Sequence, residues 1–187
     1  EVNAEGKMGN PQKVADHLGS METAPDKGAL TAYNGRFYFV YASREGEKDV
    51  LYCSIFDGAV WNTPIALTSG DKSALKPALW VGDLHKDGQE KLLLLYLADN
   101  GRISQTMANW FTMHNGGVEL LDQVALSDYS ISRPALTQHE DGFFVAYQEI
   151  NERHSDLYVR FLQVKTDGTQ LLPQNAIKVS SNSGERQ

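Results

Sequence analysis

The sequence predicts an all-β protein made of repeated four-stranded antiparallel units. Three features recur in the same order along the chain: an Ala-Leu pair, a turn signal containing glycine, and a strongly apolar run that ends near a tyrosine. The Ala-Leu pairs are Ala29-Leu30, Ala78-Leu79 and Ala135-Leu136. No segment has a sustained 3.6-residue period of apolar residues, so long helices are not expected.

Each unit divides into four short strands separated by turns. The turns after the first strands contain Asn34-Gly35, Asp87-Gly88 and Asp141-Gly142, and these residue types accept the positive φ that tight hairpins require. The second runs are RFYFVYAS, EKLLLLYLA and FFVAYQEI, the third are VLYCSIF, RISQTMANWF and LYVRFLQV, and the fourth are PIALT, QVALS and AIKVS. We expect the tyrosines of the second strands to be buried at equivalent positions, which are Tyr41, Tyr96 and Tyr147.

Four antiparallel strands in a unit of this length are typical of a β-propeller blade. The Ala-Leu pairs are separated by 49 residues and then by 57. A β-sandwich is the structural alternative, but a sandwich need not repeat its motifs in this order. We divide the chain into residues 1–27 (an outer strand of a preceding blade and a linker) and blades at 28–76, 77–133 and 134–187. Within the blades, we expect sheets at 28–67, 77–126 and 134–179.

The two ends of the sequence add an expectation about the ring. Residues 13–18, KVADHL, resemble a fourth strand, and the chain stops where another first strand would follow. The sequence therefore holds four fourth strands but three copies of the others. A closed ring has equal numbers, so we expect a slice of a larger propeller, completed by its remaining blades. A three-blade protomer that pairs with a second copy is less favoured, because the extra strand has no place.

Composition excludes several classes of function. The 187 residues are 41% hydrophobic and 22% charged, which is typical of a globular domain. A net charge of −7 argues against nucleic-acid or anionic-membrane partners, which favour a basic face. No apolar run approaches the roughly 18 residues that span a bilayer. The single cysteine, Cys53, lies in an apolar run, so we expect a buried thiol and no internal disulfide.

The stretch SIFDGAVW, residues 54–61, resembles the Asp-box turn of sialidase-like propellers and the blade turn of propeller lectins. The usual order is Ser-x-Asp-x-Gly-x-x-Trp, whereas Asp57 here directly precedes Gly58, and the other units keep only HNGG and TDGT. The resemblance implies a propeller that binds or processes carbohydrate in a secreted or extracytoplasmic protein. It also implies a structural Asp box opposite the site, with Asp57 capping backbone N–H groups and Trp61 packing on its hairpin.

Candidate site residues lie in the loops from second to third strands and from fourth to first strands, which share one face in a propeller. These loops hold Arg44, Glu45, Asp99, Asn100, Tyr129, Arg133, Glu149, Arg153, His154 and Asp156. The strongest candidates for binding a ligand are Arg133, Glu149, Arg153, Arg44 and Tyr129. Arginines can bind carboxylates or hydroxyls through paired hydrogen bonds, and Glu149 follows an apolar strand that fixes its position.

No catalytic residues can be assigned. Glycoside hydrolysis generally uses two carboxyl groups at a set separation, and no order or spacing of acidic residues singles out such a pair. The five histidines are scattered, and we expect neither a metal nor a cofactor. Two hypotheses remain: a propeller that binds or processes carbohydrate, and a non-catalytic propeller scaffold for protein–protein interaction. Trp61, Trp80 and Trp110 occupy different places in their units, which weakens the lectin interpretation.

Overall fold

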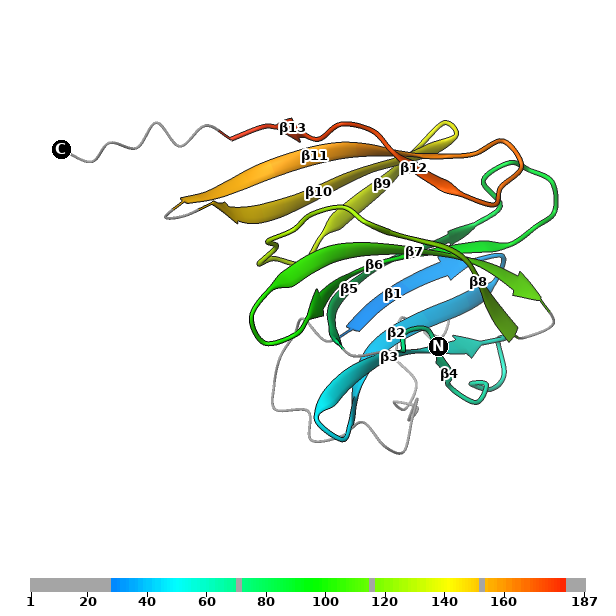
Figure 1. The fold of residues 1–187 in the computed structure, drawn as a ribbon. Coiled ribbons are helices and arrows are strands. Elements are labelled where there is room, and N and C mark those ends of the chain that lie inside the picture. Colours follow the sequence, from blue (N-terminus) through cyan, green and yellow to red (C-terminus); the bar gives the residue numbers. More distant parts are fainter. Residues whose placement is uncertain (1–27, 70–71, 115–116, 152–153, 181–187) are drawn as a thin grey trace, which may run out of the picture.

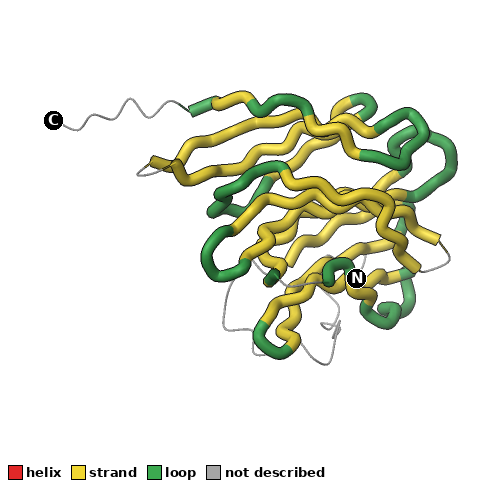
Figure 2. Tube along the Cα trace, viewed as in Figure 1, coloured by secondary structure: helices red, strands yellow, loops and turns green. Residues whose placement is uncertain are grey.

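The structure is a computed structural model that describes residues 28–69, 72–114, 117–151 and 154–180. These residues form antiparallel strands joined by turns, with no helix among them (Figures 1 and 2). The expected all-β fold is therefore confirmed. The strand expected at residues 13–18 lies outside the described residues.

Three antiparallel sheets follow one another along the chain. The strands of the first two pair in sequence order, whereas in the third the last strand pairs with the third strand of its sheet and not with the strand before it. The first sheet contains β1 (Gly28–Tyr33), β2 (Arg36–Glu45), β3 (Lys48–Phe56) and β4 (Ile65–Ala66). The second contains β5 (Ser73–Gly82), β6 (Lys91–Asp99), β7 (Ser104–His114) and β8 (Gly117–Ala125). The third contains β9 (Ala135–His139), β10 (Gly142–Asn151), β11 (His154–Val164), β12 (Leu171–Pro173) and β13 (Ile177–Lys178).

Two sheets differ from the expected strand pattern. Strand β5 begins at Ser73, before the expected start at Pro77. Its pairing with β6 shifts between Leu75 and Ala78, and Lys76 has a φ of 53°. Pro77 has no N–H to give to the ladder, so a bulge carries the strand past it. In the third sheet, both short strands β12 and β13 pair with β11, where one fourth strand was expected.

The turn residues predicted from the sequence form the hairpin turn in the first unit, but in the third unit the turn lies one residue earlier than predicted. Asn34 and Gly35 have φ values of 48° and 75°, as a two-residue hairpin requires. In the third unit the turn residues are Glu140 and Asp141, because His139 already pairs with Gly142. Gly142 is needed for a different reason: a Cβ there would lie 2.5 Å from the Leu162 carbonyl oxygen.

The second sheet lies between the other two and is buried on both faces (Figure 1). Along β6, Leu92 and Leu94 belong to the core shared with the first sheet, whereas Leu93 and Leu95 belong to the core shared with the third. All four side chains have no exposed surface. Successive residues of a strand point to opposite faces, so this near-continuous apolar run suits a strand buried on both sides.

The three tyrosines of the repeat occupy the same place in their units. Tyr41, Tyr96 and Tyr147 are each the sixth residue of a second strand and are 4%, 5% and 1% exposed. Tyr96 faces the first sheet and Tyr147 faces the second. The expected equivalence and burial are therefore confirmed.

The first strands of the three sheets also lie next to one another, since β1 contacts β5 and β5 contacts β9. The described sheets do not close into a ring.

Candidate functional site

A cleft of about 390 Å³ opens between the second and third sheets. Its walls come from the β6–β7 hairpin, the loop between β8 and β9, and the end of β10. The lining residues are Arg102, Ile103, Ser104, Tyr129, Ser130, Ile131 and Ile150. These residues belong to the loop classes that the sequence predicts for the site, namely a second-to-third turn and a fourth-to-first connection.

The β6–β7 hairpin sets one wall of the cleft. The Asn100 side-chain oxygen accepts hydrogen bonds from the backbone N–H groups of Arg102 (3.0 Å) and Ile103 (2.9 Å). Asp99 accepts one from the N–H of Gly101 (2.7 Å), which has a φ of 81°. Short polar side chains and a glycine are suited to such a turn. Asp99 and Asn100, which were candidate ligand residues, therefore shape the wall.

The opposite wall is the β8–β9 loop, and backbone hydrogen bonds tie it to both sheets. Ser130 donates its N–H to the carbonyl of Ser104 in the second sheet (2.6 Å). Ile150, in the third sheet, donates its N–H to the carbonyl of Tyr129 (2.9 Å). The loop is thus fixed on both sides, and Tyr129 remains 56% exposed over the cleft.

A cluster of buried hydroxyl groups lies behind Ser130. The hydroxyl oxygens of Thr106 and Ser130 are 2.5 Å apart, and those of Ser127 and Ser130 are also 2.5 Å apart. Ser127 Oγ accepts the backbone N–H of Thr106 (2.8 Å). All three residues are buried. Because each hydroxyl is bonded within the cluster, it holds the loop in place at the base of the cleft.

Glu149, close to the cleft, has a carboxyl group whose pKa is shifted by its surroundings. Burial raises the pKa of its carboxyl group, and the nearby carboxylate of Asp128 raises it further. The Arg160 guanidinium and a hydrogen bond from the backbone N–H of Asp128 act in the opposite direction. On the same sheet, the Tyr147 hydroxyl and Arg160 Nε are buried without a hydrogen-bond partner among the described residues. The third sheet therefore has a polar region at this end.

The structure brings two of the five strongest sequence candidates to this cleft. Tyr129 lines it, and Glu149 forms a β-bridge with Ser130. Arg44 instead pairs with Asp49 (3.3 Å) in the β2–β3 hairpin of the first sheet.

Arg133 is also bound elsewhere, since its guanidinium donates a hydrogen bond to the carbonyl of Gly28. Arg153 lies outside the described residues. Of the other loop candidates, Asp156 is buried and forms an ion pair with Lys178 (2.7 Å). Arg102, Ser130 and the isoleucines of the cleft were not predicted from the sequence, because the loops of each unit were considered separately. A partial signal was present, since both classes of loop were expected on one face, but it did not specify which loops meet across that face.

A second cleft, of about 260 Å³, lies at the other end, between the first and second sheets. The carboxylate groups that line this cleft already have hydrogen-bond or ion-pair partners within the fold. The Tyr38 hydroxyl donates a hydrogen bond to Glu90, which also lies 3.9 Å from the Arg36 guanidinium. Asp57 accepts the backbone N–H groups of residues 59 and 60 at 2.9 Å each, and these bonds lower its pKa.

The Asp57 turn therefore has the structural role expected of it. Gly58 has a φ of 103°, and the Trp61 ring lies 5.3 Å from that of Phe56 on the same hairpin. The capping by Asp57 and the packing of Trp61 are both confirmed. Arg36, Asp57 and Glu90 all have partners within the fold, so we place the candidate site at the larger cleft.

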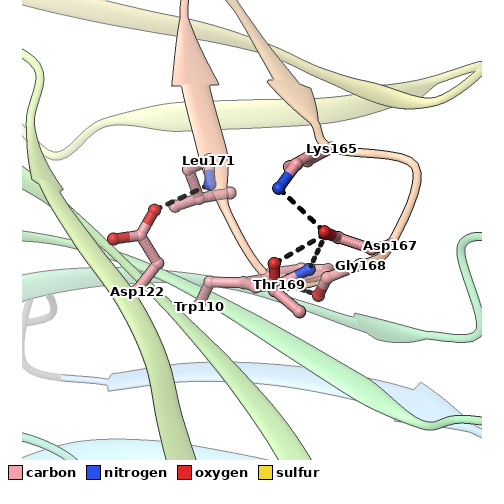
Figure 3. A network of polar contacts seen from close by, with 7 residues as sticks. All are labelled: Trp110, Asp122, Lys165, Asp167, Gly168, Thr169 and Leu171. Carbon is pink, nitrogen blue, oxygen red and sulfur yellow. Dashed lines mark hydrogen bonds and ion pairs between the residues drawn. The ribbon is translucent and has the colours of Figure 1, made fainter.

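The matching turn of the third unit joins two sheets (Figure 3). The Trp110 indole N–H, in the second sheet, donates to the carbonyl of Gly168 (2.9 Å). Asp122, also in the second sheet, accepts the backbone N–H of Leu171 (2.8 Å). Hydrogen bonds from Lys165 and Thr169 lower the pKa of the Asp167 carboxyl group to about 2. The turn thus pins the third sheet to the second at the end opposite the larger cleft.

The remaining reactive groups do not form a second centre in the part of the chain that the structure describes. Cys53 is a free thiol with no exposed surface, and burial raises its pKa to about 12, so it is a poor nucleophile. Across the described ranges, no three His, Cys, Asp or Glu side chains are grouped as metal ligands would be. The same ranges hold no helix with the length and apolar character needed to cross a membrane.

In comparisons with known proteins, no family model, no curated protein and no solved structure matched the chain.

Proposed function

We propose that the chain is part of a β-propeller that binds carbohydrate in the cleft between its second and third sheets. Three features support the propeller: each sheet contains a four-strand antiparallel meander, the sheets pack face to face, and the first strands adjoin. On this account the first strands line the central axis. The resemblance of the Asp57 turn to an Asp box supports the same architecture and, with it, a secreted or extracytoplasmic location.

The observation that carries carbohydrate binding is the placement of Tyr129. An exposed aromatic ring on a fixed loop, beside a cleft lined by both polar and aliphatic side chains, can stack on the apolar face of a sugar. Arg102 and Ser104 on the facing wall supply donors for sugar hydroxyls or a carboxylate. Backbone bonds hold the loop on both sides, so the site is preformed, which limits the entropy lost on binding.

We propose that this site binds carbohydrate, and we do not propose that it hydrolyses glycosidic bonds. Glu149 has the raised pKa of a proton donor, but its carboxylate accepts the backbone N–H of Asp128 and so serves the loop. A glycosidase needs a second carboxyl group across the scissile bond. Asp128 is next to Glu149 on the same wall, which does not supply that geometry.

A second candidate function is a scaffold for a protein partner. Ile103, Ile131 and Ile150 are 38%, 38% and 46% exposed around the same cleft. Such a group of exposed aliphatic side chains with a polar border is typical of a protein-binding surface. A peptide with an apolar anchor would use these side chains, whereas a sugar would depend on Tyr129 and Arg102.

A glycan array probed with matched variants separates these functions. We expect the unmodified chain to bind a subset of glycans, and Tyr129→Ala and Arg102→Ala to lose that binding. Arg44→Ala is the control, because Arg44 lies in the equivalent hairpin of the first sheet and away from the cleft. Absence of binding to any glycan would contradict the carbohydrate assignment, as would an equal loss in the Arg44 variant.

A further inference from the structure

Lys76 has a backbone conformation that a residue inside a strand rarely adopts. It lies in β5, and its φ of 53° falls in the left-handed region. Among the described residues, the other non-glycine positions with a positive φ are Asn34, Lys86 and Glu140, and all three lie in connections between strands. A residue with a Cβ is strained in this region, and a residue before a proline normally has an extended backbone. Such strain persists where the surrounding structure holds it in place, and it often accompanies a functional site.

The strained position changes the side of the sheet that Lys76 serves. Successive residues of a strand alternate between the two faces of a sheet. Ala74 packs in the core shared with the first sheet, so an unbroken strand would direct residue 76 to that side as well. The bulge before Ala78 breaks this alternation, and Ala78 packs on the core shared with the third sheet. Lys76 Nζ donates a hydrogen bond to the carbonyl of Ile131 (2.8 Å), in the loop that leads to the third sheet.

The carbonyl that Lys76 binds belongs to a wall of the larger cleft. Ile131 follows Tyr129 and Ser130 in the β8–β9 loop, and all three residues line the cleft. Backbone hydrogen bonds already tie this loop to β7 and to β10. The bond from Lys76 adds a third attachment, from β5, and its donor is charged, which makes it stronger than a bond between neutral groups. Three strands of two sheets therefore hold one short loop.

We propose that Lys76 is a positioning residue of the cleft: its strained backbone aims the ammonium group at the Ile131 carbonyl, and the resulting bond holds the loop that carries Tyr129. The fold gives up some stability at this position to fix the wall of the cleft. Lys76 acts through the loop and not through contact with a ligand. Its effect on ligand binding rests on the proposed function, whereas its effect on the loop does not depend on any ligand.

Three variants separate the hydrogen bond from the backbone strain. Lys76→Gly relieves the strain, because glycine adopts a positive φ readily, and it also removes the ammonium group. Lys76→Arg keeps a charged donor on a long side chain. Lys86→Gly is the matched control, since Lys86 also has a positive φ, of 57°, but lies between β5 and β6, at the end of the second sheet opposite the β6–β7 hairpin of the cleft.

The first measurement is hydrogen exchange of backbone amides, followed by nuclear magnetic resonance without any ligand. The N–H groups of Ser130 and Ile150 join the loop to the two sheets. In Lys76→Gly we expect both to exchange about tenfold faster, the effect of losing one hydrogen bond from a charged donor. The N–H of Ile103, on the opposite wall, should exchange as before. The melting temperature should stay the same or rise, because the released strain offsets the lost bond.

The second measurement is binding on the glycan array. For glycans that the unmodified chain binds, we expect about tenfold weaker binding by Lys76→Gly, and unchanged binding by Lys76→Arg and Lys86→Gly. A loss of binding without a loss of stability is not expected of a residue with a purely structural role. If the unmodified chain binds no glycan, the proposed function is contradicted, and the exchange measurement alone decides the role of Lys76.

Three results would overturn the positioning role. One is unchanged exchange at Ser130 and Ile150 in Lys76→Gly. Another is loosening in Lys76→Arg equal to that in Lys76→Gly, since the charged donor would then not be what holds the loop. The third is equal loosening in Lys86→Gly, or faster exchange at Ile103 as well, because the effect would then be general and not confined to the wall that Lys76 binds.

Discussion

The two interfaces between sheets have different chemistry. The core between the first and second sheets consists mainly of aliphatic side chains and ends at the hydrogen bond from Tyr38 to Glu90. The core between the second and third sheets contains Trp80, Trp110 and Phe143, with ring centroids between 4.9 and 6.1 Å apart. It is also joined by hydrogen bonds that cross from one sheet to the other.

A single equivalent position accounts for much of this difference. Ile55 and Trp110 each lie three residues beyond the partner of a repeat tyrosine, and each points toward the following sheet. Isoleucine can only pack there. Tryptophan packs and also carries an indole N–H that reaches the carbonyl of Gly168 in the next unit. The second interface is therefore fixed at one end by specific bonds, and the candidate cleft lies at its other end.

The largest expected effect is at the tryptophan of the second interface. Trp110 has no exposed surface, so Trp110→Ala should lower the free energy of unfolding by about 3–5 kcal/mol through the lost packing and the cavity left behind. Urea denaturation measures it. Trp61→Ala, on a hairpin edge, should cost clearly less. Equal losses in the two variants would mean that the second interface does not depend on its aromatic core.

The next effect concerns the bond from Leu171 to Asp122. Asp122→Ala should cost about 1–3 kcal/mol, because the N–H of the buried Leu171 would lose its acceptor. Asp122→Asn retains an oxygen that can accept this bond and should lose less. Thermal or urea unfolding of the two variants checks the order. If alanine and asparagine are equally mild, the polar bonds do not distinguish the second interface from the first.

An effect of similar size is expected at the turn of the first unit. Gly58 has a positive φ, and a Cβ at this position would meet no atoms within 4 Å beyond those of its chain neighbours. Gly58→Val should therefore cost about 1–3 kcal/mol through backbone strain alone, measured by thermal unfolding.

Gly168→Val should cost more, since Gly168 is buried and its carbonyl accepts the bond from Trp110. Ligand binding in the cleft should survive in the Gly58 variant, because its turn lies at the other end of the sheets. Lost binding with an unchanged melting temperature would mean that the Asp57 turn is itself a site.

The smallest effect is a pH dependence at the polar end of the second interface. Burial raises the pKa of Glu149 above its ordinary value of 4.5, so the folded protein holds this proton more tightly than the unfolded chain. The free energy of unfolding should therefore fall as pH rises from about 4.5 through the raised pKa. Glu149→Gln should remove this component while keeping an acceptor for the Asp128 N–H. A difference curve between the two proteins that is flat, or that rises with pH, would contradict the assignment.

Local chemistry made much of the fold predictable from the sequence. Alternating apolar residues and Asn-Gly or Asp-Gly pairs act within a few residues, so the strand order and most turns could be predicted. The position of Tyr96 between two sheets followed from its place in a repeat. The bulge before Ala78 was missed, although Pro77 is a signal for one because it lacks an N–H.

The candidate site was less predictable because it depends on contacts between units. The bond from Ser130 to Ser104 joins a loop residue to the first residue of β7, and no local pattern specifies it. Arg44 and Arg133 have suitable chemistry and lie in suitable loops, but each finds a partner away from the cleft. Loop side chains are chosen by which neighbours they meet across sheets, and one sequence alone does not specify those neighbours.

The central claim is that equivalent sheets stack face to face and that Trp110 joins the second to the third. Nuclear magnetic resonance of the three indole N–H groups tests it directly, with each signal assigned by a Trp→Phe variant. We predict that the Trp110 indole N–H exchanges slowly with solvent, shows nuclear Overhauser effects to Phe143, and outlasts the Trp61 signal by a wide margin. A Trp110 signal that exchanges as fast as that of Trp61, without contacts to Phe143, would contradict the stacking of these sheets.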